Sequence, residues 1–144
     1  MKTIINDGGR EASGFKGKAG DCVTRSIAIV TGLPYAKIYS DLSDGCVNQR
    51  IGKRGKRKNN ASNGVNVNRK WFKGYMGKLG FKFVATMGIG TGCKVHLRDG
   101  ELPMGRLIVS VSKHYTAVID GVVHDTFDPT RGGNRCVYGY WIKI

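Results

Sequence analysis

The sequence predicts an α+β fold, because helical patterns occupy its first half and strand-like segments its second half. Up to about residue 80, apolar residues recur every three or four positions. After that point, short runs rich in β-branched and aromatic residues alternate with Gly, Pro and Asp-Gly turns. Helices followed by strands, rather than alternating with them, are typical of helices packed on one sheet.

Three helices are expected. The first begins at Cys22, with Asp21 as its N-cap and Gly32 as its stop. The second begins at Pro34, since proline suits a first helical turn, and ends before Gly45. Their apolar positions are Val23, Ile27, Val30, Tyr35, Ile38 and Leu42.

The third helix is expected over about residues 65–79, with an apolar stripe and two weakening glycines. The stripe consists of Trp71, Phe72, Tyr75, Met76 and Leu79. Residues 1–20 are expected to be a Gly-rich arm, and residues 48–64 a basic flexible loop. Strands are expected at 81–86, 93–97, 106–112, 114–119, 122–127 and 136–144.

Length and hydropathy limit the number of domains and the class of protein that the sequence can form. A chain of 144 residues matches the commonest domain size, so one domain over residues 1–144 is expected. No apolar run approaches the roughly 18 residues that cross a bilayer, and the first residues lack the apolar core of a secretory signal. We therefore expect a cytoplasmic protein with no membrane partner.

The net charge of +14 is concentrated in one segment. Residues 50–82 carry eleven Lys or Arg and no acidic residue, whereas the segments before and after carry net charges of only +1 and +2. Such a block indicates binding of nucleic acid or of an acidic host protein, or else a solvated loop and helix face. The candidate binding residues are Arg50, Lys53, Arg54, Lys56, Arg57, Lys58, Arg69 and Lys70.

The four cysteines are widely spaced, so most of them are expected to be reduced, and two or three to be small core residues. Cys93 and His96 have a spacing that two zinc ligands can have, together with Cys22 or His114, but two ligands are weak evidence. No metal site and no cofactor is expected. The segment GIGTG at 88–92 lacks the ending of a phosphate-binding loop and is expected to be a turn.

Cys22 and His114 are the candidate catalytic pair. The N-terminus of a helix stabilises a thiolate, and Cys22 is expected there. His114 begins a strand that leads into the Asp120-Gly121 turn, the strongest short hairpin signal. With that turn, Ile119 faces Val122. His114 and Asp125 then project from the same face of adjacent strands, within reach of each other.

Other readings of these residues stay open. Asp128 is the second candidate for the orienting carboxylate, because Pro129 can redirect it. His124 projects from the opposite face and is expected to be structural. Cys22 and His114 can equally be a buried thiol and a hydrogen-bonded structural imidazole, and Asp125 a turn residue.

The order of these motifs resembles that of the papain-like cysteine peptidases, and most of all their small domains that process bacteriocin leaders. The resemblance rests on GDC at 20–22, HYTAVIDG at 114–121 and HDTFDP at 124–129. It implies a papain-like fold with N-terminal helices packed on a C-terminal antiparallel sheet or half-barrel. Three longer strings are similar to uncharacterised bacteriophage and prophage proteins: GDCVTRSIAIVTGLPY, ELPMGRLIVSVSKHYTAVIDGVVHDT and RCVYGYW.

The peptidase resemblance implies a role for each matching residue. Cys22 is the nucleophile, with its backbone N–H as one oxyanion donor; His114 is the general base and acid; and Asp125 orients the imidazole. The family usually has a Gln six residues before the Cys as the second donor, and here that residue is Lys16. Asn6, or a backbone N–H of the Gly-rich arm, is the expected substitute.

Three functions are compatible with these features. The first is a cysteine-dependent hydrolase of phage origin, acting as a peptidase or amidase on a peptide or protein. The second is a non-enzymatic phage protein that binds nucleic acid or an acidic host protein through residues 50–82, on a degenerate peptidase-like scaffold. The third is a structural or regulatory phage component with neither property.

Overall fold

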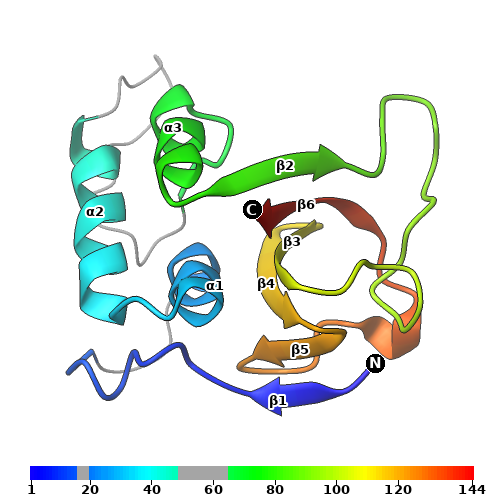
Figure 1. Ribbon diagram of the computed structural model, residues 1–144, viewed down its shortest axis with the longest axis horizontal. Helices are drawn as coiled ribbons and strands as arrows, with labels where there is room; N and C mark the ends of the chain where they lie inside the picture. Colours follow the sequence, from blue (N-terminus) through cyan, green and yellow to red (C-terminus); the bar gives the residue numbers. More distant parts are fainter. Residues whose placement is uncertain (16–19, 49–64) are drawn as a thin grey trace.

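A computed structural model describes residues 1–15, 20–48 and 65–144. In Figure 1, the helices stand on one side of a strongly curved sheet. The helices are α1 (Cys22–Thr31), α2 (Tyr35–Asn48) and α3 (Lys70–Lys78). The strands are β1 (Thr3–Ile5), β2 (Phe81–Ala85), β3 (Arg106–Val111), β4 (His114–Ile119), β5 (Val122–Asp125) and β6 (Val137–Lys143).

The described strands form one six-stranded mixed sheet in the order β1-β5-β4-β3-β6-β2. The α+β prediction is confirmed, and the C-terminal strands β2 to β6 pair antiparallel as expected, but an N-terminal strand makes the sheet mixed. Residues Thr3–Ile5, expected in an irregular arm, form an edge strand that pairs parallel to β5. A strand of three residues is too short to show the alternation of apolar and polar residues by which strands are predicted, and the strand with which it pairs is distant in sequence.

The hairpin of β4 and β5 has the predicted register. Ile119 pairs with Val122, Val118 with Val123 and Ala117 with His124. Both turn residues, Asp120 and Gly121, have positive φ angles of 48° and 80°. A two-residue hairpin turn of type I′ requires positive φ at both positions, which is why Asp-Gly predicts it.

Two expected helix boundaries differ from the structure. The second helix does not end before Gly45 but continues to Asn48. A glycine is required at position 45 of the helix, because the Trp71 ring of α3 occupies the space where a Cβ atom of residue 45 would lie. The third helix begins at Lys70, so the segment 65–69 before it is not helical.

The strand expected at 93–97 is also absent from the described structure. Among the described residues, the β-pairing of this segment is limited to one isolated bridge, between His96 and Cys136. It belongs to the connection between β2 and β3, which crosses the side of the sheet opposite the helices (Figure 1). Leu97 of this connection is fully buried, so the segment covers the sheet without joining it as a strand.

The apolar core has two parts, one on each face of the sheet. The larger part lies between the helices and the sheet; its fully buried members include Ile27, Ile38, Leu42, Phe72, Met76 and Ile108. The smaller part lies on the other face and contains Leu97, Leu107, Val109, Val111, Val118, Val123 and Val137. Ile108 and its neighbours in β3 contribute to opposite parts, as the alternation of side chains along a strand requires. None of the helices in the described ranges is long and apolar enough to span a membrane.

We predict opposite effects for two Gly→Ala substitutions within helices. Gly45→Ala places a methyl group in the volume of the Trp71 ring and lowers the free energy of unfolding by about 1–3 kcal/mol. Gly74→Ala meets nothing within 4 Å and raises it by about 0.5–1 kcal/mol, because alanine restricts the unfolded chain. Urea unfolding of both variants measures the difference. A Gly45→Ala variant as stable as Gly74→Ala would contradict the packing of α2 against α3.

Candidate active site

Three elements place the predicted catalytic residues together. Cys22 is the first residue of α1, His114 is the first residue of β4, and Asp125 is the last residue of β5. Helix α1 packs against β4, as the view in Figure 1 shows. The hairpin places His114 and Asp125 at the same end of the sheet, and α1 brings Cys22 to that end.

Asp125 holds the imidazole of His114. Its Oδ2 atom lies 2.7 Å from His114 Nε2, and the Thr116 hydroxyl donates to the same oxygen at 2.7 Å. Asp125 is 2% exposed, and burial alone would raise the pKa of its carboxyl; hydrogen bonds from His114 and Thr116 reverse this and lower the pKa. Asp125 is therefore a carboxylate that fixes the orientation of the ring. The predicted proximity of His114 and Asp125 is confirmed.

The Cys22 thiol and the His114 imidazole interact closely enough for each to shift the pKa of the other. Because Nε2 of the ring faces Asp125, Nδ1 is the nitrogen that remains for the sulfur. Burial would raise the pKa of the Cys22 thiol, but the hydrogen bond with His114, a hydrogen bond from the Tyr115 backbone N–H and the charge of Arg25 together lower it. The N–H groups of the first turn of α1 add further stabilisation of an anion at this position.

The pKa of His114 moves in the opposite direction. Burial would lower it, but the hydrogen bonds with Asp125 and with Cys22 raise it to about 9. A lowered thiol pKa beside a raised imidazole pKa favours the thiolate–imidazolium form of the pair, with Asp125 as the second anion. This arrangement favours transfer of the thiol proton to His114, which produces the thiolate that nucleophilic chemistry requires.

A buried network of ion pairs and hydrogen bonds lies beside the site and contacts Asp125. Arg25 of α1 is 8% exposed and contacts carboxylates on two different segments: it pairs with Asp21, and its Nη2 lies 3.3 Å from Asp125 Oδ1. The Tyr35 hydroxyl donates to Asp21 at 2.6 Å and accepts from Arg10 at 2.8 Å. Two buried carboxylates are thus matched by cations and a hydroxyl donor.

Sequence reasoning missed Arg25 and misjudged Asp21. Asp21 does occupy the N-cap position of α1, but its side chain makes no capping hydrogen bond and binds Arg25 and Tyr35 instead. The available signal was an arginine within the apolar pattern of a helix, four residues after an aspartate. Such a residue is buried only with an anionic partner.

The structure does not bring the other candidates to Cys22. Asp128 is exposed, and its Oδ1 accepts hydrogen bonds from the backbone and hydroxyl of Thr130. The Asn6 side chain accepts a hydrogen bond from the Gly8 N–H at 2.8 Å, while its own backbone N–H donates to the Asp125 carbonyl. Lys16 lies outside the described residues.

The predicted binding segment is mostly outside the described residues as well. This applies to Arg50, Lys53, Arg54, Lys56, Arg57 and Lys58. Arg69 directly precedes α3, and Lys70 is its exposed first residue. Binding of nucleic acid or of an acidic protein stays a prediction.

The expectation that most of the cysteines are reduced is wrong for two of the four. Cys93 and Cys136 form a disulfide, whereas Cys22 and Cys46 are not disulfide-bonded. Cys46 is a fully buried core residue, as expected for at least two cysteines. The 43-residue separation of the bonded pair has no local signature, so spacing alone does not reveal it.

No protein-family model, no curated protein and no solved structure matches this chain.

We predict that Cys22 reacts with iodoacetamide well below the ordinary thiol pKa of about 8.5. In His114→Ala the hydrogen bond and the positive charge are lost while burial remains, so the thiol pKa rises and labelling at pH 6.5 falls by about tenfold or more. Mass spectrometry of the Cys22 peptide across pH 5–10 measures both profiles. His124→Gln, a change on the neighbouring strand, is the matched control and keeps the native profile.

We also predict unequal costs for two ion pairs with the same helical spacing. Arg25→Met leaves the buried Asp21 and Asp125 short of a cation and lowers the free energy of unfolding by about 3–5 kcal/mol. Lys37→Met breaks the exposed pair with Asp41 and costs less than about 0.5 kcal/mol. Urea denaturation at pH 7 compares them, and similar losses would show that Arg25 is not the buried support of the site.

Proposed function

We propose that this protein is a cysteine-dependent hydrolase that acts on peptide or related amide bonds by acyl transfer. The observation that carries the proposal is the interaction of Cys22, at the start of α1, with the His114 imidazole, whose Nε2 lies 2.7 Å from Asp125 Oδ2. Cys22 is the nucleophile, His114 the general acid and base, and Asp125 the group that orients the imidazole. The resemblance of these motifs to papain-like peptidases supports the same assignment.

The reaction follows from the protonation states of the pair. The Cys22 thiolate attacks the carbonyl carbon, and the His114 imidazolium gives its Nδ1 proton to the departing amine, which leaves a thioester on Cys22. The neutral imidazole then takes a proton from water as that water attacks the thioester. Collapse of the tetrahedral intermediate then releases the carboxylic acid and restores the Cys22 thiolate beside the His114 imidazolium.

Oxyanion stabilisation comes in this proposal from the start of α1. The first N–H groups of a helix have no acceptor within the helix, so the Cys22 backbone N–H is available to a developing oxyanion. Asn6 is adjacent to the site through its backbone hydrogen bond to the Asp125 carbonyl. Its side-chain carbonyl is engaged by Gly8, which leaves the amide NH₂ group as the donor that Asn6 can offer.

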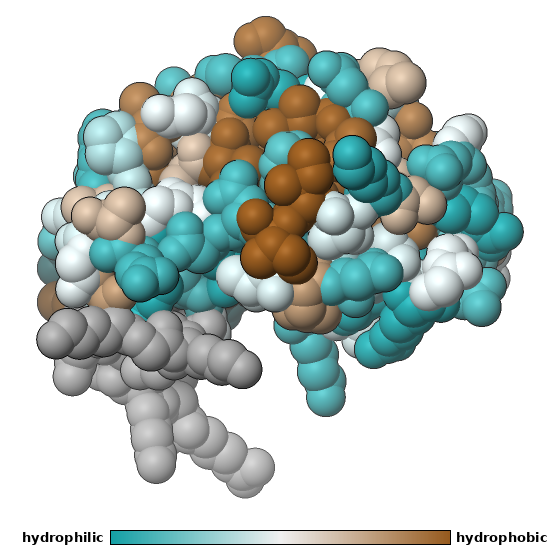
Figure 2. Space-filling view, turned by 90° about the horizontal axis from the view of Figure 1, so that it is seen from below, coloured by the Kyte–Doolittle hydropathy of each residue, from teal (hydrophilic) through white to brown (hydrophobic). Residues whose placement is uncertain are grey.

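Apolar side chains beside the site favour a substrate with an apolar residue near the scissile bond. The Phe127 ring lies 5.1 Å from the His114 ring and is 47% exposed. Ile5 of β1, paired with Asp125 in the sheet, is 71% exposed. Figure 2, which views the molecule from the side of β1 and β5, shows a band of apolar residues among hydrophilic ones.

The test is hydrolysis of a mixed peptide library rich in apolar residues, followed by mass spectrometry. We expect cleavage by the native chain and a loss of at least about 10³-fold in Cys22→Ala and in His114→Ala. His124→Gln is the control that retains cleavage. If the library stays intact while Cys22 shows low-pH alkylation, the activated thiol is real but amide hydrolysis is not its reaction.

Once a cleaved peptide is known, the pH profile tests Asp125. Rate should rise with ionisation of Cys22 and fall again near pH 9, where His114 loses the proton that the leaving amine needs. Asp125→Asn removes the negative charge that raises the pKa of His114, so the alkaline limb moves to lower pH. Asp128→Asn is the matched control and leaves the profile unchanged. An unmoved limb in Asp125→Asn would contradict the assigned role.

A further inference from the structure

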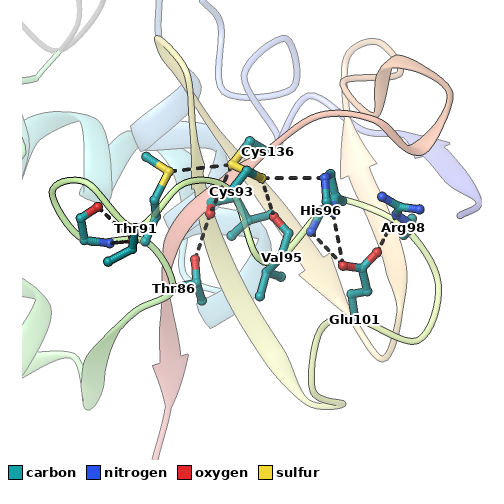
Figure 3. Close-up of a disulfide and its surroundings, with 11 residues drawn as sticks. Thr86, Thr91, Cys93, Val95, His96, Arg98, Glu101 and Cys136 are labelled. Atoms are coloured by element: carbon teal, nitrogen blue, oxygen red, sulfur yellow. Dashed lines mark hydrogen bonds and ion pairs between the residues drawn. A yellow bond between two sulfur atoms is a disulfide. The ribbon is translucent and has the colours of Figure 1, made fainter.

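A second arrangement of cysteine, histidine and carboxylate lies in the connection between β2 and β3, apart from the residues of the proposed active site. Cys93 Sγ is 3.6 Å from His96 Nε2, and His96 Nδ1 is 3.2 Å from Glu101 Oε1. Figure 3 shows the three side chains in line, with Cys93 bonded to Cys136 at one end and Arg98 on the Glu101 carboxylate at the other.

The two sulfur atoms of this disulfide are in different environments. Cys93 is exposed, whereas Cys136 is partly buried with Met87 Sδ 3.9 Å from its sulfur. His96 contacts the sulfur of Cys93. Among the described residues, no other imidazole has an interaction with either sulfur. A small reagent from solvent therefore reaches the sulfur that has a proton acceptor beside it.

Glu101 holds His96 by two contacts. One oxygen of its carboxylate accepts the backbone N–H of His96 at 3.2 Å and faces the ring nitrogen remote from Cys93. Desolvation raises the pKa of Glu101, but the hydrogen bonds from the His96 ring and backbone and the charge of Arg98 together lower it. Glu101 is thus an anion that directs Nε2 of the imidazole toward the sulfur.

Backbone pairing keeps the two cysteines together without the S–S bond. The Leu97 N–H donates to the Arg135 carbonyl at 2.8 Å, and the Val137 N–H donates to the Val95 carbonyl at 2.8 Å. These two hydrogen bonds flank the bridge between His96 and Cys136. After reduction, Cys136 stays beside Cys93 and can attack a mixed disulfide formed there.

We propose that Cys93 and Cys136 form a redox-active dithiol that exchanges with low-molecular-weight disulfides and thiols, such as glutathione. Cys93 is the attacking thiol, Cys136 resolves the mixed disulfide, His96 accepts the Cys93 proton, and Glu101 positions His96. The site shares no residue with the Cys22 site, so it stands independently of the proposed hydrolase activity.

The exchange balances in both directions. In the dithiol form, His96 takes the Cys93 proton, and the Cys93 thiolate attacks a disulfide RSSR, which forms Cys93–S–S–R and releases RS⁻, protonated by the His96 imidazolium. Deprotonated Cys136 then attacks Cys93 Sγ, which closes the protein disulfide and releases a second RS⁻, protonated from solvent. The dithiol is oxidised by two electrons and RSSR is reduced to two RSH; excess RSH reverses each step.

The first experiment locates the attacking sulfur, in a full-length Cys22→Ser background so that the proposed hydrolase thiol does not contribute. The reduced chain is mixed with glutathione disulfide, quenched with acid at intervals and mapped by mass spectrometry. We expect a transient glutathione adduct on Cys93 that converts to the Cys93–Cys136 disulfide, and a stable Cys93 adduct when Cys136→Ser is added. A predominant adduct on Cys136, or no closure to the disulfide, would overturn the proposal.

The second experiment tests His96 by the rate of adduct formation. At pH 7, His96→Gln should slow the reaction of Cys93 by about tenfold, because the thiol then ionises near its ordinary pKa of about 8.5. At pH 9.5 the two rates should converge, which a merely structural role of His96 would not produce. His124→Gln is the matched control at both pH values. Equal rates at pH 7 for His96→Gln and its parent would refute the role of His96.

Discussion

The candidate active site depends on one buried ion pair system, in which Arg25 lies between Asp21 and Asp125. A carboxylate as buried as Asp125 is stable only with compensating donors, and it has Arg25 on one oxygen and His114 on the other. Because Arg25 follows Cys22 by three residues in the same helix, its contact with Asp125 also determines where the thiol stands. The need of the buried Asp125 for these two partners therefore fixes the position of Cys22 relative to His114.

The two ends of this network have different consequences for the sulfur. Asp125 raises the proton affinity of His114, and the charged imidazole in turn favours the thiolate of Cys22. Asp21 balances the charge of Arg25, and Tyr35 and Arg10 contact the same carboxylate. The network thus separates the groups that set reactivity from the groups that make a buried charge tolerable.

The features that the sequence predicted are those encoded locally. Helix α1 with Cys22 at its start, and the β4–β5 hairpin with its register, each depend on residues close together in the chain. The Asp-Gly turn allows few pairings, so it was possible to deduce that His114 and Asp125 are neighbours. The contact of Cys22 with that hairpin was expected from the resemblance to a known arrangement and not from any spacing.

The features that were missed depend on partners far apart in sequence. Arg25 and Asp125 are 100 residues apart, and Cys93 and Cys136 are 43 apart. Strand β1 is three residues long and pairs in parallel, so it has neither a turn nor an alternation to reveal it. Gly45 was interpreted as a helix end. Its actual role is to leave room for the Trp71 ring, which belongs to another helix and is distant in sequence.

The hairpin has a consequence for the order in which the site can assemble. His114 and Asp125 are eleven residues apart and need only a two-residue turn to meet, whereas Cys22 comes from the other half of the chain. Hairpin closure takes microseconds, and long-range docking must overcome a larger loss of chain entropy. His114 and Asp125 can therefore meet early, while the Cys22 thiol reaches His114 only when α1 docks. Any reactivity of Cys22 that requires His114 is consequently a property of the folded chain, and a nascent or unfolded chain carries an ordinary thiol.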